Sequence, residues 1–141
     1  MNTISNYLKL VVAVLALTSL NARAEVSEEG AWMRLLPPMS KMTAAYMKLK
    51  SDQDDRLLGA SSELAEVVEI HQSKMEDGVM SMQEVSCLEL PENQSVELKP
   101  QSYHLMVMGL KAPLQAGDVH RFVLEFEQAG KLEIQVPVRA N

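Results

Sequence analysis

The sequence predicts an all-β fold, a Greek-key sandwich or barrel, and three observations indicate it. Short runs of alternating apolar and polar residues recur along the chain at spacings near ten residues. Clusters of Pro, Gly, Asn, Asp and Ser separate these runs. Beyond an apolar stretch at the N-terminus, no segment has the apolar spacing of a long amphipathic helix. Many short, evenly spaced strands in 141 residues are typical of a single Greek-key domain.

Residues 1–24 are expected to be a cleaved signal peptide rather than part of this fold. Lys9 precedes an apolar run at residues 10–17, and Ala22 and Ala24 supply the small residues that signal peptidase requires at alternating positions. The run is shorter than the roughly 20 residues that span a bilayer, so stable membrane insertion is not expected. An uncleaved anchor or a buried helix is the alternative. Export places the mature domain in an oxidising compartment, of which a bacterial periplasm is the simplest example.

The mature domain, residues 25–141, contains nine predicted strands. In order they are residues 31–36, 44–50, 56–60, 66–71, 79–85, 95–98, 103–110, 119–127 and 131–138. Turn-forming residues separate them: Pro37-Pro38, the polar run 51–55, Ser61-Ser62, Glu76-Asp77-Gly78, Pro91-Glu92-Asn93, Pro100-Gln101-Ser102 and Gln128-Ala129-Gly130. The last of these is a hairpin turn, and one short helical turn is possible around Leu114.

Composition excludes several classes of function. With 13 Lys and Arg against 19 Asp and Glu, the formal net charge is −6, which disfavours nucleic acid or an anionic membrane as the main partner. The single cysteine, Cys87, excludes an intrachain disulfide and any metal site built from cysteines alone. The sequence has no nucleophile elbow, no phosphate-binding glycine loop and no Cys-x-x-Cys pair. We therefore expect a protein that is not an enzyme.

The unusual feature of the sequence is a surplus of methionine. Two of the methionines form a spaced motif with two histidines. Ten methionines accompany only six aromatic residues. His71 is followed after ten residues by Met82, then after twenty-one more by His104, with Met106 two positions on. His104 and Met106 emerge from the same face of one predicted strand. Neighbouring strands of a Greek key could bring all four side chains together.

These four ligand types favour copper(I). Thioethers are soft ligands that bind monovalent copper, whereas zinc normally recruits thiolate, further histidine or carboxylate. The set lacks the cysteine of a blue-copper centre, which disfavours an electron carrier. Methionine also needs no deprotonation to bind a metal, so only the imidazoles make affinity fall in acid.

The spacing H-x10-M-x21-H-x-M resembles the periplasmic copper chaperones called PCu(A)C proteins. The resemblance covers essentially the whole mature chain. It includes Ala44-Ala45-Tyr46-Met47, Asp54-Asp55-Arg56-Leu57, Val68-Glu69-Ile70-His71, Gly78-Val79-Met80, Val96-Glu97-Leu98-Lys99-Pro100, Tyr103-His104-Leu105-Met106 and Phe126-Glu127-Gln128-Ala129-Gly130. It implies a cupredoxin-like β-sandwich that binds copper(I) through His71, Met82, His104 and Met106. The implied role of the monomer is to pass copper, in a transient complex, toward the dinuclear copper centre of cytochrome c oxidase, or to handle periplasmic copper more generally.

Some residues depart from the family pattern or allow a plainer interpretation. Cys87 stands where many relatives have a Gly-rich turn, and the second copper site that some relatives hold in a His- and Met-rich C-terminal tail is not expected here. Met75, Met80 and Met108 could flank the copper or form a hydrophobic collar. His120 is expected to be solvated. Other methionines, Met33, Met42 and Met47, are expected to fill the core, and Met39 to lie exposed in a loop. Copper sequestration or tolerance is the alternative function.

Overall fold

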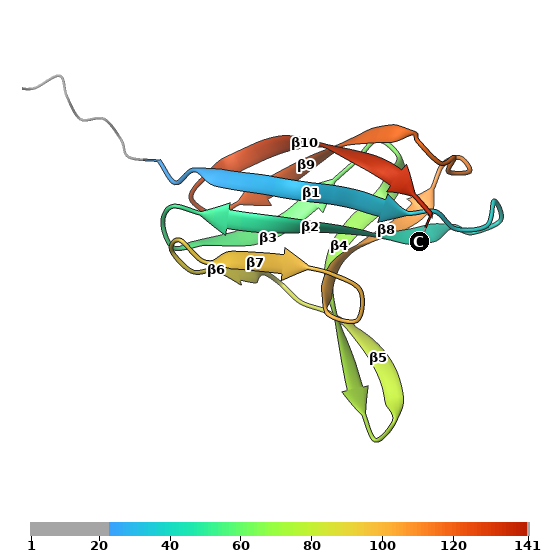
Figure 1. The fold of residues 1–141 in the computed structure, drawn as a ribbon, viewed down its shortest axis with the longest axis horizontal. Helices are drawn as coiled ribbons and strands as arrows, with labels where there is room; N and C mark the ends of the chain where they lie inside the picture. The colour runs from blue at the N-terminus through green and yellow to red at the C-terminus, as the bar shows by residue number, and fades with distance from the viewer. Residues whose placement is uncertain (1–22, 141) are drawn as a thin grey trace, which may run out of the picture.

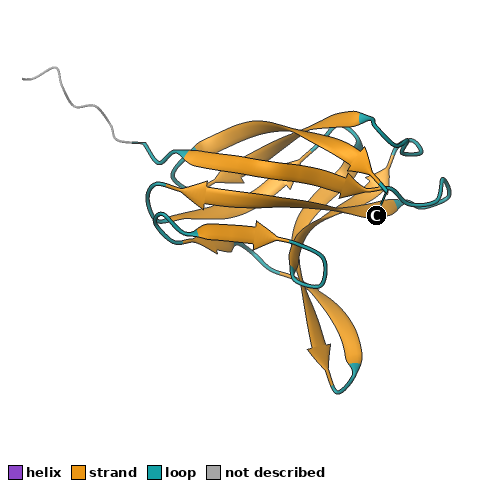
Figure 2. Cartoon of the chain, viewed as in Figure 1, coloured by secondary structure: helices purple, strands orange, loops and turns teal. Residues whose placement is uncertain are grey.

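The computed structural model describes residues 23–140, and this part of the chain consists of strands and loops (Figure 2). The strands are β1 (Val26–Arg34), β2 (Met42–Ser51), β3 (Asp55–Ser61), β4 (Ala65–Glu76), β5 (Val79–Glu84), β6 (Leu88–Leu90), β7 (Ser95–Leu98), β8 (Tyr103–Leu110), β9 (Val119–Phe126) and β10 (Gly130–Arg139). Within residues 23–140 there is no helix long and apolar enough to cross a membrane. The expected signal peptide lies almost entirely outside the described residues.

Seven of the strands close into a barrel, which confirms the predicted all-β fold (Figure 1). Their order is β4-β8-β2-β1-β10-β9-β3, and the pairing of Ala60 with Val68 joins β3 back to β4. The pairing of β1 with β10 is parallel, and every other pairing between these strands is antiparallel. Strand β7 pairs with β2, β6 with β3, and β5 with β4. Strands distant in sequence therefore lie side by side, as a Greek-key arrangement requires.

Alternation along the strands decides which side chains fill the barrel. On β8, Leu105 and Val107 point inward and are fully buried. On β9, Phe122, Leu124 and Phe126 do the same. Because side chains alternate across a strand, the residues between Leu105 and Val107 and on either side of them lie on the outer face of the barrel. The core thus fixes which face of β8 is available for binding.

The first strand begins earlier than its sequence pattern predicts. We expected residues 31–36, but β1 starts at Val26. The β1–β2 register shifts between Glu29 and Trp32, and Gly30 has a φ of +67° in this bulge. A bulge adds a residue and breaks the period of two, so the pattern hides the first half of the strand. The three-residue β6 was not predicted, and residues around Leu114 form a loop rather than a helical turn.

Strand β4 is twice as long as predicted and leaves the barrel. The expected strand ended at His71, whereas β4 continues to Glu76 and pairs with β5 as a hairpin. This hairpin extends away from the barrel (Figure 1). All six residues of β5 are exposed. The predicted strand at residues 79–85 is confirmed as β5, whereas the second half of β4 was missed because residues 72–76 are mostly polar and do not pack against the core.

Asp55 is a buried carboxylate that joins two distant turns. Its Oδ1 accepts hydrogen bonds from the backbone N–H groups of Arg56 and Gln128, each at 2.8 Å, and its Oδ2 accepts one from Ala129 at 3.0 Å. The predicted turn between β9 and β10 is confirmed, and Asp55 holds it against the start of β3. Hydrogen bonds to a charged acceptor contribute about 1.5–3 kcal/mol each.

The Asp55→Ala variant is expected to lower the free energy of unfolding by about 3 kcal/mol, because backbone N–H groups of the β9–β10 turn lose their acceptor. Urea denaturation followed by circular dichroism measures this change. The matched control is Glu125→Ala on the exposed face of β9, which is expected to change stability by no more than about 0.5 kcal/mol. Equal effects of the two substitutions would contradict the assigned role of Asp55.

Candidate metal centre

The pairing of β4 with β8 brings the two predicted histidine ligands together. His71 and His104 lie directly opposite each other in this antiparallel pair. Directly opposite residues share one face of a sheet, with Cβ atoms about 4.5–5.5 Å apart. The centroids of the two imidazole rings are 5.9 Å apart and the ring planes are inclined at 50°. Two residues separated by 33 positions in sequence thus form one side-chain pair on the outer face of the barrel.

The two predicted methionine ligands lie on the same face. Met106 is two residues beyond His104 on β8, and Met82 on β5 pairs with Ser73, two residues beyond His71 on β4. Met82, His104 and Met106 line one cavity of about 240 Å³. His71 is not among the residues that line this cavity, but its ring lies beside that of His104. The structure therefore brings the four predicted residues to one place.

One ring nitrogen of His104 is hydrogen-bonded, and the other has no partner among the described residues. Its side chain is buried, with 2% of its surface exposed, and its Nδ1 donates a hydrogen bond to the carbonyl oxygen of Ser102 at 3.0 Å. Since a carbonyl can only accept, Nδ1 carries the proton and Nε2 keeps its lone pair. Nε2 is buried and has no hydrogen-bond partner among residues 23–140. An unpartnered buried nitrogen is costly, and a bound metal ion would satisfy it.

The surroundings of His104 favour its neutral form. Burial lowers the pKa of the imidazole, and the nearby His71 and Arg34 lower it further. The hydrogen bond to Ser102 acts in the opposite direction but does not offset burial. A neutral imidazole is the form that binds a metal, so His104 needs no proton removed at neutral pH.

In His71 the ring nitrogen without a partner is Nδ1, whereas in His104 it is Nε2. Its Nε2 lies 2.8 Å from Oε2 of Glu69, its neighbour on the same face of β4. The carboxylate accepts this hydrogen bond, which leaves the lone pair on Nδ1. That Nδ1 is also buried without a partner among the described residues. Glu69 thereby fixes the orientation of the ring, as outer carboxylates commonly do for metal-binding histidines. Glu69 is not among the predicted site residues, although its position two residues before His71 on a predicted strand places both side chains on one face.

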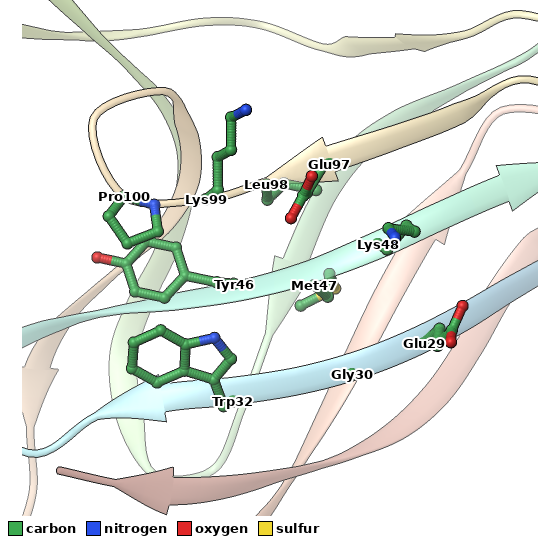
Figure 3. Close-up of a pocket in the computed structure, with 10 residues that line it drawn as sticks. All are labelled: Glu29, Gly30, Trp32, Tyr46, Met47, Lys48, Glu97, Leu98, Lys99 and Pro100. Carbon is green, nitrogen blue, oxygen red and sulfur yellow. The ribbon is translucent and has the colours of Figure 1, made fainter. Parts of the chain in front are cut away.

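Aromatic rings form one wall beside His104. The ring centroid of Tyr46 lies 6.5 Å from that of His104 and 4.8 Å from that of Trp32. The guanidinium of Arg34 lies 5.5 Å from the centre of the Tyr46 ring. Burial raises the pKa of the Tyr46 phenol, and Arg34 partly opposes this effect. Tyr46 lines both the cavity at the histidines and a second pocket, in which its ring lies between Trp32 and Pro100 (Figure 3).

The remaining histidine and cysteine lie away from the centre. Cys87 is in the loop between β5 and β6, with its Sγ 4.0 Å from Oε1 of Glu89. His120 is on β9, where it pairs with Val136 of β10. We expected a solvated side chain for His120, but it is half-buried and its Nε2 has no exposed surface. That expectation was wrong, since the side chain is partly shielded from solvent.

The other methionines lie in different environments. Met33 and Met47 are buried in the core, and Met39 is exposed in the β1–β2 loop, as predicted. Met42 was expected in the core, but half of its surface is exposed and it lines the cavity with Met106. Its place opposite Met108 on the outer face of β2 explains the error. A further group, Met75 and Met80, lies on the exposed hairpin.

The donors gathered here are two imidazole nitrogens and two thioethers. Among residues 23–140 there is no group of three or more His, Cys, Asp or Glu side chains placed to hold a metal ion. The available set is neutral and soft, which is the chemistry that suits a soft monovalent ion. Such a set can hold that ion without a thiolate.

Comparison with known proteins extends this description. Residues 26–138 match the model of the LpqE-like lipoprotein family. A curated relative, lipoprotein Lxx21020 of Leifsonia xyli, is 34% identical over 103 residues, which cover 71% of this chain and 62% of the relative. The chain thus spans less than two thirds of that relative.

Solved structures share the fold. The solution structure of the copper(I) form of DR1885 from Deinococcus radiodurans is 32% identical, with a TM-score of 0.67 over 89% of this chain and 87% of that one. The copper-bound PCuAC domain of PmoF2 has a TM-score of 0.70 at 23% identity, covering 85% of this chain and 97% of that domain. The predicted cupredoxin-like fold is therefore confirmed.

In the metal-free protein, His104 is expected to titrate with a midpoint below 6.5, which NMR of its ring C–H protons measures. The unfolded chain then takes up a proton at a higher pH than the folded chain does. The free energy of unfolding is therefore expected to fall as the pH is lowered from 6.5 through the folded pKa, and to be unaffected by this group above 6.5. The His104→Gln variant should lack this part of the pH dependence. A midpoint at or above 6.5 would show that burial does not control this histidine.

Proposed function

Because this chain belongs to the LpqE-like family of PCuAC-type domains, we propose that it is an extracytoplasmic copper(I) carrier that binds one ion through His71, Met82, His104 and Met106. The observation that carries the proposal is the pair of buried imidazole nitrogens, one on each histidine, that lack a partner among the described residues. They lie beside two thioethers on one face of the barrel. The copper(I) form of DR1885, at 32% identity, supports the same metal.

Copper(I) fits this donor set better than other biological metals. Thioether sulfur is a soft ligand with little affinity for zinc, magnesium or calcium. In an oxidising compartment, paired thiols would be consumed as disulfides, whereas methionine is not. The neutral ligands leave the bound ion with a net positive charge, which limits affinity and favours release. These properties suit a carrier rather than a permanent cofactor site.

The exposure of the proposed ligands suggests the order in which they dissociate from the copper ion. Met82 is 54% exposed on the hairpin, whereas His104 is buried in the barrel face. An incoming ligand from a partner can reach the metal from the Met82 side. Thioethers are also weaker ligands than imidazoles. We therefore propose that a partner's donors replace Met82 first and His104 last, by ligand exchange within a transient complex.

The destination of the copper is proposed to be the dinuclear copper centre of cytochrome c oxidase. The second candidate is sequestration of excess copper, which the same site could perform. The lipoprotein name of the curated relative supports a location outside the cytoplasm, and the apolar run near the N-terminus supports export to the periplasm. We propose a binding role without catalysis, in line with the copper(I) form of DR1885.

The His104→Ala, Met106→Ala double variant is expected to lose at least about 100-fold in copper(I) affinity, more than an outer-sphere substitution typically costs. Anaerobic titration of residues 25–141 against a competing chelator measures this. The matched control is the His120→Ala, Met39→Ala double variant, which removes the same two residue types away from the site. Unchanged affinity in the first variant would refute the assigned ligands.

Deletion of the gene tests delivery against sequestration. Delivery predicts a loss of oxidase activity that added copper restores, because the oxidase itself is intact. Growth and oxidase assays at low and high copper measure this. Copper sensitivity with normal oxidase activity would instead support sequestration.

A further inference from the structure

The β4–β5 hairpin carries three methionines on one face. Met75 lies directly opposite Met80, and Met82 lies opposite Ser73, two positions closer to the barrel. Met80 and Met82 are separated by one residue of β5, so they point to the same side. His71 is on this face too, at the barrel end of the hairpin. The three thioethers therefore form a row that leads from the hairpin tip to the proposed copper site.

Packing does not account for these methionines. Met75 is 62% exposed, Met80 42% and Met82 54%. The opposite face of the hairpin is exposed as well, yet it carries polar residues such as Lys74, Ser81 and Gln83. Val79, beside the turn, is the one apolar residue on that face. A hairpin with two solvent-exposed faces has no packing reason to place methionine on one of them only.

We propose that Met75 and Met80 form a second, weaker copper(I) site that loads the first through Met82. This rests on the proposed function for the identity of the ion. Directly opposite residues have Cβ atoms about 4.5–5.5 Å apart, and methionine has three rotatable side-chain bonds, so both sulfurs can converge on one ion. Thioethers alone bind copper(I), but without imidazole the site is the weaker of the two.

The position of Met82 explains how an ion would move between the sites. It is next to Met80 on the hairpin face and it also lines the cavity with His104 and Met106. When the first site is empty, an ion held by Met75 and Met80 can bond to Met82 and keep that bond while the imidazoles replace Met75 and Met80. No proton has to leave a thioether during this exchange. Glu76 and Asp77, at the hairpin turn, add negative charge where the cation would first arrive.

The test is an anaerobic copper(I) titration of residues 25–141 in which the methionine methyl groups are followed by NMR. The wild type is expected to bind a first equivalent tightly and a second one weakly, with the methyl signals of Met75 and Met80 shifting during the second. In the Met75→Leu, Met80→Leu variant the second equivalent is lost. The affinity for the first changes by no more than about tenfold, the size of an outer-sphere effect.

Leucine keeps the apolar surface, so this variant separates a thioether site from a docking surface. The matched control is Met39→Leu, which replaces the most exposed methionine of the described residues, in the β1–β2 loop. Retention of the second equivalent without Met75 and Met80, or its loss in Met39→Leu, would overturn the hairpin site.

The two proposals can fail separately. In the His104→Ala, Met106→Ala variant the hairpin is intact, so the Met75 and Met80 signals are still expected to shift with copper(I). If the wild type lacks tight binding but these signals shift, the proposed carrier site is wrong and the hairpin site stands. If tight binding is present and these signals do not move, the hairpin site is wrong and the carrier site stands.

Discussion

The antiparallel register between β4 and β8 is the constraint on which the candidate centre depends. It sets His71 opposite His104, and the same register sets Glu69 opposite Met106. A slip of one residue would send one histidine to the other face of the sheet, into the core. The register is secured because Ile70 and Leu105, also opposite each other, are both buried inside the barrel. Hydrophobic burial on one face therefore positions the candidate ligands on the other.

The centre combines a rigid half with an exposed half. His104 and Met106 belong to β8, which pairs with β4 on one edge and β2 on the other. Met82 belongs to β5, which pairs with β4 and whose residues are all exposed. Fixed ligands favour specificity, and an accessible ligand favours exchange with a partner. The fold thus places the candidate ligands on strands with different support, since β8 is paired on both edges and β5 is exposed.

Much of the site could be predicted from sequence because it depends on two local regularities. The parity of residues in a strand places His104 beside Met106, and ligand softness points to copper(I). What could not be predicted depends on pairing between distant strands. The role of Glu69 requires knowledge of the His71 rotamer, and the exposure of Met42 requires knowledge that β2 lies beside β8. The first half of β1 was likewise not predicted, because the bulge at Gly30 interrupts the alternation of apolar and polar residues.

The parallel pairing of β1 with β10 has a consequence for the order of assembly. Met33 pairs with Val138, so the first and last strands of the domain must meet before the barrel is closed. Until β10 is synthesised, β1 and β9 each have an unpaired edge, and the barrel does not yet fully bury their core residues. Contacts between chain ends are the most non-local that a domain can make, and such contacts slow folding. A chain of this topology cannot close its barrel until its last strand, β10, is available to pair with both β1 and β9.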